Sequence, residues 1–235
     1  MIRLFFGTSN GGKLRELRRL VAGLPVEVIS PEDLGRPLPE VVEDGLTFRE
    51  NAEKKAAAFA RFAGTWALAD DSGLCVDLLA GRPGVYSARW SELDPPRGAA
   101  SPACALGEAG RCELGAEGSR GLRDERNNDK LLEELAGVPD DRRGAAYVAV
   151  LALARPDGTI QASVEGDCRG RIGRARRGDG GFGYDPLFLP EGGEGRTMAE
   201  LAPEEKDAVS HRGRAFRALR PLLGQLPFDK SERQG

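Results

Sequence analysis

The sequence predicts a single α/β domain built on a mixed β-sheet, and three observations carry this prediction. Short apolar runs alternate along the chain with segments of helical periodicity. Residues 145–154 form a nearly continuous apolar run, which is typical of a central strand covered on both faces. The turn Pro156-Asp157-Gly158 then returns the chain through residues 160–165, where apolar and polar side chains alternate, so the sheet is mixed.

The composition indicates a soluble protein that does not bind a nucleic-acid polymer. The chain has 235 residues, of which 40% are hydrophobic, enough for a substantial core. Its formal charge of -3 gives no general basic excess to hold a nucleic-acid backbone, although it is compatible with a local cationic pocket for a small anion. No apolar run suits a signal peptide or a membrane span, so we expect a cytoplasmic protein.

The cysteines and the histidine limit the metal chemistry. The four cysteines form no CxxC pair and no regular disulfide spacing, so we expect reduced thiols without structural zinc. The single histidine, His211, excludes a His-rich metal site.

A glycine-rich loop, residues 7–13, follows the first predicted strand, residues 2–6, and ends in Lys13 at the start of a helix. Backbone N–H groups of such a loop and of the helix N-terminus can bind a phosphate, and Lys13 adds a positive charge. The spacing is not GxxxxGK[ST], so a P-loop kinase or ATPase is not supported. An ordinary strand-to-helix turn explains the same pattern.

A second strand is predicted at residues 26–29, and a Thr-x-x-Glu capping box then starts a long helix. Apolar positions at helical spacing extend this helix over about residues 48–62. We expect the charged residues Lys54, Lys55 and Arg61 to point outward.

Two adjacent aspartates, Asp70 and Asp71, end the short predicted strand 66–69 and precede a Ser-Gly turn. Ligands of α/β sheets gather at the carboxyl ends of strands, and Asp oxygens are the hard ligands that Mg²⁺ prefers. Glu43, just before the long helix, either favours the helix dipole or adds another metal ligand. The alternative for the two aspartates is a turn composed of residues that prefer turns.

Residues 91–126 are dominated by Gly, Ala, Pro and charge, with almost no periodic apolar positions. We interpret them as a long flexible loop inserted in the domain. The next helix is predicted to begin at Asn127, with Leu131, Leu132 and Leu135 on its buried face.

A glycine-dense segment, residues 178–186, follows a short predicted strand at residues 169–172. Glycines allow the backbone to approach a ligand closely, Phe182 or Tyr184 could stack on a flat base, and Asp185 could accept hydrogen bonds from its edge. The alternative is a tight turn whose aromatic side chains close the core.

The last predicted helix begins at Ser210 and carries His211 and Arg212 near its N-terminal end. Cations there oppose the helix dipole, so together with Lys206 they indicate a bound anion. Residues 229–235 are expected to form a polar tail.

Seven motifs in the same order resemble the Ham1 or inosine triphosphatase family of noncanonical purine nucleoside triphosphate pyrophosphatases. Each motif alone is weak evidence, but this many in register are very specific. The motifs cover nearly the whole chain except the insertion and the tail, and they are residues 8–13, 43–48, 69–74, 83–89, 128–132, 181–186 and 205–206 with 210–213.

The resemblance implies an α/β fold with an elongated mixed sheet flanked by helices, two lobes with a nucleotide cleft between them, and a homodimer. It also implies Mg²⁺-dependent hydrolysis of ITP, dITP and XTP to the monophosphate and pyrophosphate, which cleanses the nucleotide pool. Residues 1–228 would form this domain, with an insertion at about residues 91–126 that is longer than the family's usual connection.

Roles for individual residues follow from the same resemblance. Asp71 is implied to be the proton acceptor and a Mg²⁺ ligand, with Glu43 and Asp70 nearby in the acidic metal site. The implied substrate-binding residues are Thr8, Ser9, Asn10, Gly11, Gly12 and Lys13 for the triphosphate, Ser72 for a substrate contact, Phe182, Gly183, Tyr184 and Asp185 for the base and sugar, and Lys206, His211 and Arg212 for base and phosphate.

Three alternatives remain beside this reading. A related pyrophosphatase with another base preference would have the same phosphate and metal residues. A nucleotide sensor without catalysis is disfavoured because Glu43, Asp70, Asp71 and Lys13 are all retained. An RNA-binding module that uses the basic last helix is disfavoured by the net negative charge.

Overall fold

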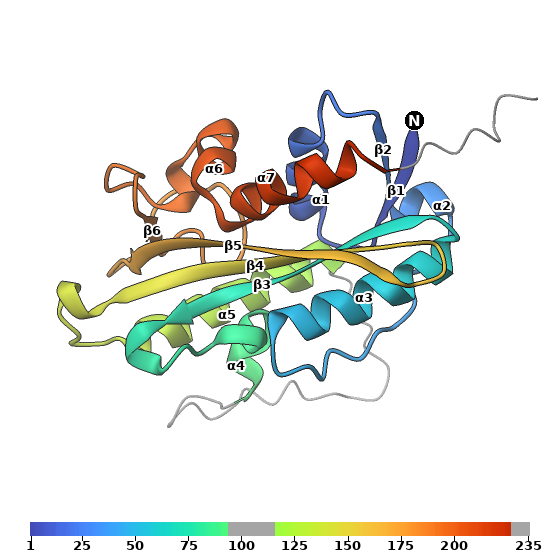
Figure 1. Cartoon of the computed structure of the whole chain (residues 1–235). Coiled ribbons are helices and arrows are strands. Elements are labelled where there is room, and N and C mark those ends of the chain that lie inside the picture. The colour runs from blue at the N-terminus through green and yellow to red at the C-terminus, as the bar shows by residue number, and fades with distance from the viewer. Residues whose placement is uncertain (94–115, 227–235) are drawn as a thin grey trace, which may run out of the picture. The chain divides into compact units, whose positions relative to one another are not determined.

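The computed structural model describes residues 1–93 and 116–226, in which strands and helices alternate along the chain (Figure 1). The strands are β1 (Ile2–Phe6), β2 (Val26–Ile29), β3 (Trp66–Val76), β4 (Gly144–Ala154), β5 (Ile160–Ile172) and β6 (Phe188–Pro190). The α-helices are α1 (Gly11–Leu20), α2 (Pro31–Leu34), α3 (Phe48–Ala63), α4 (Trp90–Leu93), α5 (Ala116–Glu134), α6 (Pro203–Val209) and α7 (His211–Leu223). The 3₁₀ turns are η1 (Asp77–Leu79), η2 (Gly84–Arg89), η3 (Asp140–Arg142) and η4 (Met198–Glu200).

The strands form a six-stranded sheet in the order β2-β1-β3-β4-β5-β6 within the described part of the chain. β1 runs parallel to β2 and to β3, and Leu4 lies opposite Val28 on one side and Trp66 on the other. β5 runs antiparallel to β6. The predicted mixed sheet of an α/β fold is therefore confirmed.

The chain divides into two compact units, and each is described by itself. The first unit consists of Met1–Ser72, Tyr147–Cys168 and Ala202–Gly235, of which residues up to 226 are described. The second unit consists of Gly73–Ala146 and Arg169–Leu201. Strands β3, β4 and β5 contribute residues to both units.

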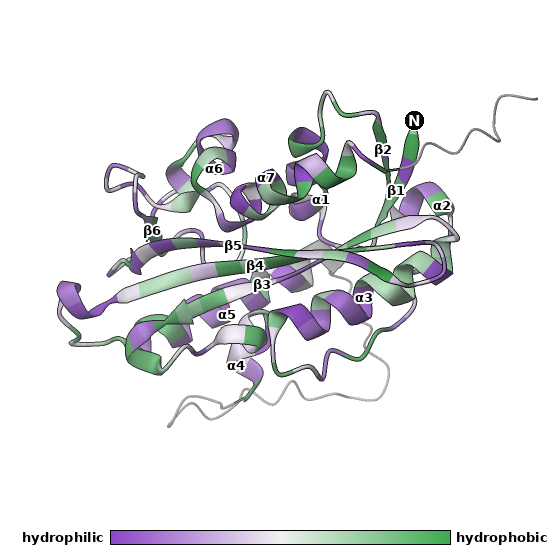
Figure 2. Ribbon diagram, viewed as in Figure 1, coloured by the Kyte–Doolittle hydropathy of each residue, from purple (hydrophilic) through white to green (hydrophobic). Residues whose placement is uncertain are grey.

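Different helices cover the two sheet faces of the first unit (Figure 1), and β4 in the middle of the sheet is largely hydrophobic (Figure 2). Apolar side chains pack in a separate core cluster on each face. Side chains of a strand alternate between faces, so Leu4 of β1 packs in the core cluster that contains α1 and α7, whereas Phe5 packs in the cluster that contains α3. In β3, Leu68 joins the first cluster and Ala67 and Ala69 join the second. The face that a β3 residue occupies therefore decides which helices its side chain meets.

Helix α5 corrects the prediction of a loop over residues 91–126. The helix begins at Ala116 rather than at Asn127, and residues 91–93 belong to α4. The stretch 116–126 contains Ala, Glu, Arg and Leu, which favour a helix even without an apolar stripe to reveal it. Residues 94–115 of the predicted insertion lie outside the described residues.

The predicted bounds of two strands, β3 and β5, are also wrong. β3 continues through Asp70 and Asp71 as far as Val76, so the two aspartates lie within the strand and not in a turn after it. β5 is one continuous strand where two short ones were expected. Asp, Ser and Gly favour turns, but the tertiary partners of Asp70 and Asp71 described below override this preference and hold the stretch extended.

Two further observations concern membrane-spanning helices and the cysteines. Within residues 1–93 and 116–226, no helix has both the length and the apolar character that crossing a bilayer requires. Cys75 is partly buried and Cys168 is buried, whereas Cys104 and Cys112 lie outside the described residues.

Gly166 of β5 lies so close to the backbone of α7 that there is no space for a side chain. A methyl group there would lie 2.3 Å from the backbone nitrogen of Ala215 and 2.4 Å from the carbonyl oxygen of His211, both in α7. We expect Gly166→Ala to displace the helix and lower the free energy of unfolding by about 1–3 kcal/mol, measured by urea titration. The control is Gly121→Ala on α5, where a Cβ meets nothing within 4 Å and should stabilise the helix by about 0.5–1 kcal/mol. A Gly166→Ala protein as stable as the control would contradict this close approach.

Candidate functional site

The candidate site in the first unit is organised by the middle of β3. Because adjacent strand residues point to opposite faces, Asp70 extends toward α1 and α7, where it meets Lys13 and Arg212, while Asp71 extends toward α3, where it meets Lys55. Both aspartates are 7% exposed. The two carboxylates are thus neighbours in sequence but have different partners.

Asp70 is the centre of a buried network of charges. Its Oδ2 atom pairs with the Lys13 ammonium and lies 3.3 Å from Arg212 Nε. The hydroxyl of Ser72 donates to the same oxygen at 3.3 Å and accepts from Arg212 Nη2 at 2.8 Å. Arg212 Nη1 also lies 3.2 Å from Glu16 Oε2. Two cations and two carboxylates balance one another, which is what buried charges require.

The charged groups of this network shift one another's pKa values. Burial raises the pKa of Asp70, but the charges of Lys13 and Arg212 outweigh burial and hold that pKa well below its usual range. Burial lowers the pKa of Lys13, and the neighbouring Asp70 carboxylate opposes that effect. Asp70 is therefore a charged group at every physiological pH and cannot serve as a general base there.

Asp71 has the opposite character. Burial raises the pKa of Asp71, and Lys55, whose Nζ lies 2.7 Å from Asp71 Oδ1, opposes this effect only in part. Lys55 also lies 3.4 Å from Glu43 Oε1, so its ammonium joins the two carboxylates. A carboxylate with a raised pKa that is held by a neighbouring cation has the properties of a proton acceptor.

The expectation that Lys55 points outward is wrong. Its side chain is 12% exposed and lies between Asp71 and Glu43. A sequence signal was available, because Lys55 stands three residues after Ala52 and four before Phe59, which places it on the buried stripe of α3. A lysine on an apolar stripe indicates a buried carboxylate partner.

The carboxylates meet some requirements of a divalent cation site. Asp70 Oδ1 and Asp71 Oδ2 are buried oxygens without a hydrogen-bond partner in the structure. Mg²⁺ typically binds one or two carboxylates together with waters and substrate phosphates, and such free oxygens fit that donor set. Among the described residues, however, no three His, Cys, Asp or Glu side chains are grouped as a metal site, and Lys55 rather than a third carboxylate lies beside Asp71 and Glu43.

The glycine-rich loop before α1 is held by its own side chains. Asn10 caps the helix and accepts hydrogen bonds from the N–H groups of Gly12 at 2.9 Å and Lys13 at 3.2 Å. Asn10 N–H in turn donates to Thr8 Oγ1 at 3.1 Å. A phosphate at this helix N-terminus would therefore compete with the Asn10 side chain for these N–H groups, whereas Lys13 points to Asp70 and Ser72.

The C-terminal cations differ from one another in charge. Lys206, His211 and Arg212 are all buried. Burial, followed by the neighbouring Arg212, lowers the pKa of His211 well below its usual value, so its imidazole is neutral. Its ring stacks on Tyr147, with centroids 4.6 Å apart and an angle of 9° between planes. A neutral His211 and an Arg212 paired with two carboxylates account for part of this charge without a bound anion, and the bound anion stays a prediction.

The predicted base-binding loop lies in the second unit. Phe182 is half-buried, whereas Tyr184 and Asp185 are each 3% exposed. Tyr184 donates from its hydroxyl to the carbonyl oxygen of Ser87 at 2.9 Å, and burial raises its pKa, so this ring closes the core. Asp185 Oδ2 accepts the N–H of Phe182 at 2.9 Å and shapes the turn. Of the two aromatic rings, Phe182 alone keeps the partial exposure that stacking on a base requires.

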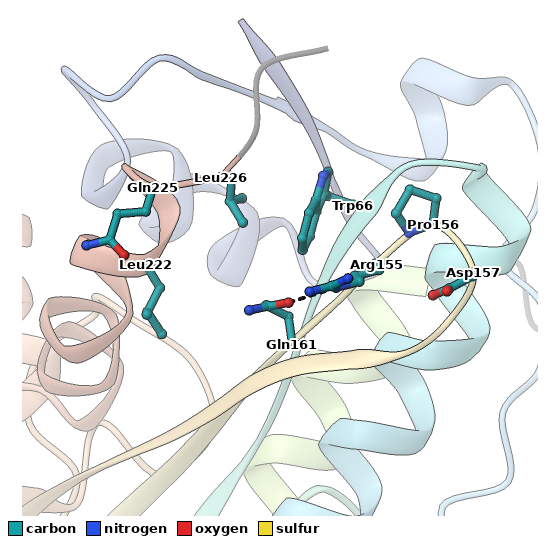
Figure 3. A pocket seen from close by; sticks show the side chains of 8 residues that line it. All are labelled: Trp66, Arg155, Pro156, Asp157, Gln161, Leu222, Gln225 and Leu226. Atoms are coloured by element: carbon teal, nitrogen blue, oxygen red, sulfur yellow. Dashed lines mark hydrogen bonds between the residues drawn. The ribbon is translucent and has the colours of Figure 1, made fainter.

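A separate cavity of about 580 Å³ lies in the first unit beside the β4–β5 hairpin and the end of α7 (Figure 3). Apolar walls from Trp66, Leu222 and Leu226 face Arg155, which donates from Nε to Gln161 at 2.8 Å. None of the predicted site residues lines this cavity. We therefore do not assign the predicted chemistry to it.

The fold and the β3 site define an α/β protein in which two partly buried lysines and a buried arginine lie against buried carboxylates. Comparison with known proteins identifies the group more closely. The chain belongs to the Ham1 family, whose model matches residues 4–106 and 113–222.

Relatives and solved structures agree with this membership. A protein of Anaeromyxobacter dehalogenans (strain 2CP-C), named dITP/XTP pyrophosphatase, is 66% identical over 230 residues, which cover 95% of this chain and 97% of that protein. A protein of the same name from Streptomyces coelicolor is 45% identical and covers 96% and 99%. The structure of a HAM1 protein from Coxiella burnetii superposes with a TM-score of 0.73 at 33% identity, covering 96% of this chain and all of that one.

The Asp70 network predicts a pH-dependent contribution to stability. Asp70→Asn would leave Lys13 without its carboxylate and Arg212 with Glu16 alone, and we expect it to lower the free energy of unfolding by about 3 kcal/mol near pH 7. Because the folded pKa of Asp70 lies below the unfolded one, this contribution is present above about pH 4 and is lost as the pH falls toward the folded pKa.

Urea unfolding of both proteins between pH 3 and 8 measures the difference. Asp44→Asn is the control, because the Asp44 side chain is 65% exposed and its pairing with Lys54 should contribute little. A difference between wild type and Asp70→Asn that does not shrink at acid pH would contradict the assigned network.

Proposed function

We propose that this protein hydrolyses the noncanonical purine nucleoside triphosphates dITP, XTP and ITP to the monophosphate and pyrophosphate, and so removes deaminated purines from the nucleotide pool. The observation that carries this proposal is its similarity, over nearly the whole chain, to relatives named dITP/XTP pyrophosphatases. The β3 site supports it with Asp71, a carboxylate of raised pKa beside the partly buried Lys55.

Asp71 is proposed as the proton acceptor. Its Oδ2 atom is buried without a partner, while Oδ1 is fixed by Lys55, so one oxygen stays available for a water molecule. In the proposed step the water oxygen bonds to the α-phosphorus, its proton passes to Asp71 Oδ2, and the bond from that phosphorus to the β-phosphate oxygen breaks. Lys13 is the cation of this site that can exchange Asp70 for the negative charge of the leaving pyrophosphate.

Mg²⁺ is the proposed cofactor, with Asp70, Asp71 and Glu43 as its candidate ligands. When bound, the ion would neutralise phosphate charge and polarise the reacting oxygens. The free oxygens of Asp70 and Asp71 support this assignment. Glu43 is the least supported of the three, since Lys55 already lies 3.4 Å from it.

Base selection is assigned to two groups of residues, each within its own unit. Phe182, Gly183, Tyr184 and Asp185 provide the loop with the half-buried ring, and Lys206, His211 and Arg212 provide donors suited to a 6-oxo group. An adenine amino group would leave such donors unpaired, at about 1–3 kcal/mol for each donor stranded. A homodimer and a location in the cytoplasm belong to the same proposal.

The test is pyrophosphate release from dITP, XTP, ITP, dATP, GTP and a pyrimidine triphosphate, with Mg²⁺ and with a chelator. We expect metal-dependent turnover confined to the deaminated purines. Turnover of another set of triphosphates would favour a pyrophosphatase with a different base preference. Binding of ITP without pyrophosphate release would favour a sensor and contradict the proposed reaction.

The role of Asp71 has its own prediction. Asp71→Asn keeps the size of the side chain but removes the proton acceptor, so we expect kcat to fall by about 100-fold or more with the fold intact. The matched control is Asp77→Asn, an exposed aspartate later in the chain that pairs with Arg169 and should leave kcat unchanged. Pyrophosphate release and circular dichroism measure both variants, and a folded Asp71→Asn protein with substantial Mg²⁺-dependent activity would refute the assignment.

A further inference from the structure

Helix α5 holds the backbone of the predicted base-binding loop with two side chains. The carboxylate of Asp124 accepts the N–H of Gly183 at 2.8 Å, and the amide of Asn128 donates from Nδ2 to the carbonyl oxygen of Gly183 at 2.9 Å. Asp124 and Asn128 are four residues apart, so they lie on the same face of the helix. Both backbone groups of one glycine are therefore bound to neighbouring turns of α5.

These two hydrogen bonds fix the peptide planes on either side of Gly183. Because each peptide group is planar, holding Gly183 N–H also sets the direction of the Phe182 carbonyl, which accepts from Asp185 N–H at 3.3 Å. Gly183 has φ of 64°, a conformation that costs glycine little. We call these two hydrogen bonds, from Asp124 and Asn128 to Gly183, the clamp. The clamp thus determines where the turn places the half-buried ring of Phe182.

The helix itself is anchored, so it can serve as a rigid support. Asn127 accepts from Ser91 N–H at 2.8 Å and donates to the carbonyl oxygen of Ser87 at 3.2 Å. Lys130 donates to the carbonyl oxygen of Trp90 at 2.9 Å. The same Ser87 carbonyl accepts from the Tyr184 hydroxyl at 2.9 Å, so the helix and the loop share an acceptor.

We propose that Asp124 and Asn128 are positioning residues for base recognition, which hold Gly183 and thereby set the place of the Phe182 ring against the purine. The proposal rests on the function proposed above for its substrate. Neither residue touches a reacting atom in this assignment, so their loss should weaken substrate binding and base discrimination more than the chemical step.

The chemistry of the two bonds gives an asymmetric test. Asp124→Asn keeps an acceptor oxygen for Gly183 N–H, whereas Asp124→Ala removes it. Asn128→Asp replaces the donor by a carboxylate oxygen that faces the Gly183 carbonyl oxygen. The amide oxygen Oδ1 of Asn128 is buried without a hydrogen-bond partner, so no donor stands ready to stabilise the introduced carboxylate. We therefore expect Asp124→Asn to keep the hydrogen bond to Gly183 N–H and Asn128→Asp to lose the hydrogen bond to the Gly183 carbonyl oxygen.

The experiment measures kcat and KM for dITP and dATP in wild type and in these three variants, with Glu133→Gln as an exposed control on the same helix. We expect KM for dITP to rise about tenfold in Asp124→Ala and in Asn128→Asp, with kcat changed by less than about threefold and the preference for dITP over dATP reduced. Asp124→Asn and Glu133→Gln should stay within about threefold of wild type. A purely structural defect would instead reduce the active fraction and kcat at unchanged KM, and that result would overturn the proposal.

Amide hydrogen exchange of Gly183 provides a readout that needs neither substrate nor turnover. Exchange in the ¹⁵N-labelled protein should be about tenfold faster in Asp124→Ala than in wild type and in Asp124→Asn. Equal exchange rates in these three proteins would overturn the clamp. The comparison does not use Asn128→Asp, so it tests the clamp even if that variant does not fold. Wild-type protein without any triphosphate turnover, but with the expected exchange pattern, would contradict the proposed function and leave the clamp supported.

Discussion

The alternation of side chains along β3 is the constraint on which the candidate site depends. A strand sends adjacent residues to opposite faces, and in the first unit these faces are covered by different helices. Asp70 therefore meets Lys13 and Arg212, and Asp71 meets Lys55. Two carboxylates adjacent in sequence consequently have pKa values shifted in opposite directions, one lowered and one raised. Such a divergence allows one acid to remain a constant charge while its neighbour transfers protons.

Under the proposed function, the same arrangement would suit a polyanionic substrate. Arg212 is buried and Lys13 is only 20% exposed beside Asp70 and Glu16, so much of the cost of removing these cations from water is met during folding. A triphosphate would share Lys13 and Arg212 with Asp70 and Glu16, and would bury neither new unpaired cations nor unpaired carboxylates. The Asn10 cap follows the same logic, because its side-chain oxygen holds N–H groups that a phosphate oxygen could take over.

How much of this could be predicted from the sequence depended on whether the signal was local. The glycine loop and the mixed sheet follow from short patterns, and the family resemblance pointed to Asp71 and Phe182. Lys55 was missed although its spacing from Ala52 and Phe59 contained the necessary signal. The continuation of β3 through Asp70 could not be predicted, because the partners that hold it extended, such as Arg212, lie far along the chain. Asp124 lies in a stretch without apolar periodicity, so the helix propensity of its residues was the one local indication of a helix there.

The two units use different physical means to hold their predicted functional residues. In the first, ion pairs and buried charge fix the groups that would act on phosphates. In the second, hydrogen bonds to the backbone of Gly183 and Phe182 fix a loop whose side chains carry little charge. This difference suits the two tasks. Phosphate binding requires charge that can be exchanged, whereas discrimination between purines that differ at one ring substituent requires a fixed geometry. A loop held by its backbone to an anchored helix supplies that geometry and leaves the ring of Phe182 as its variable contact.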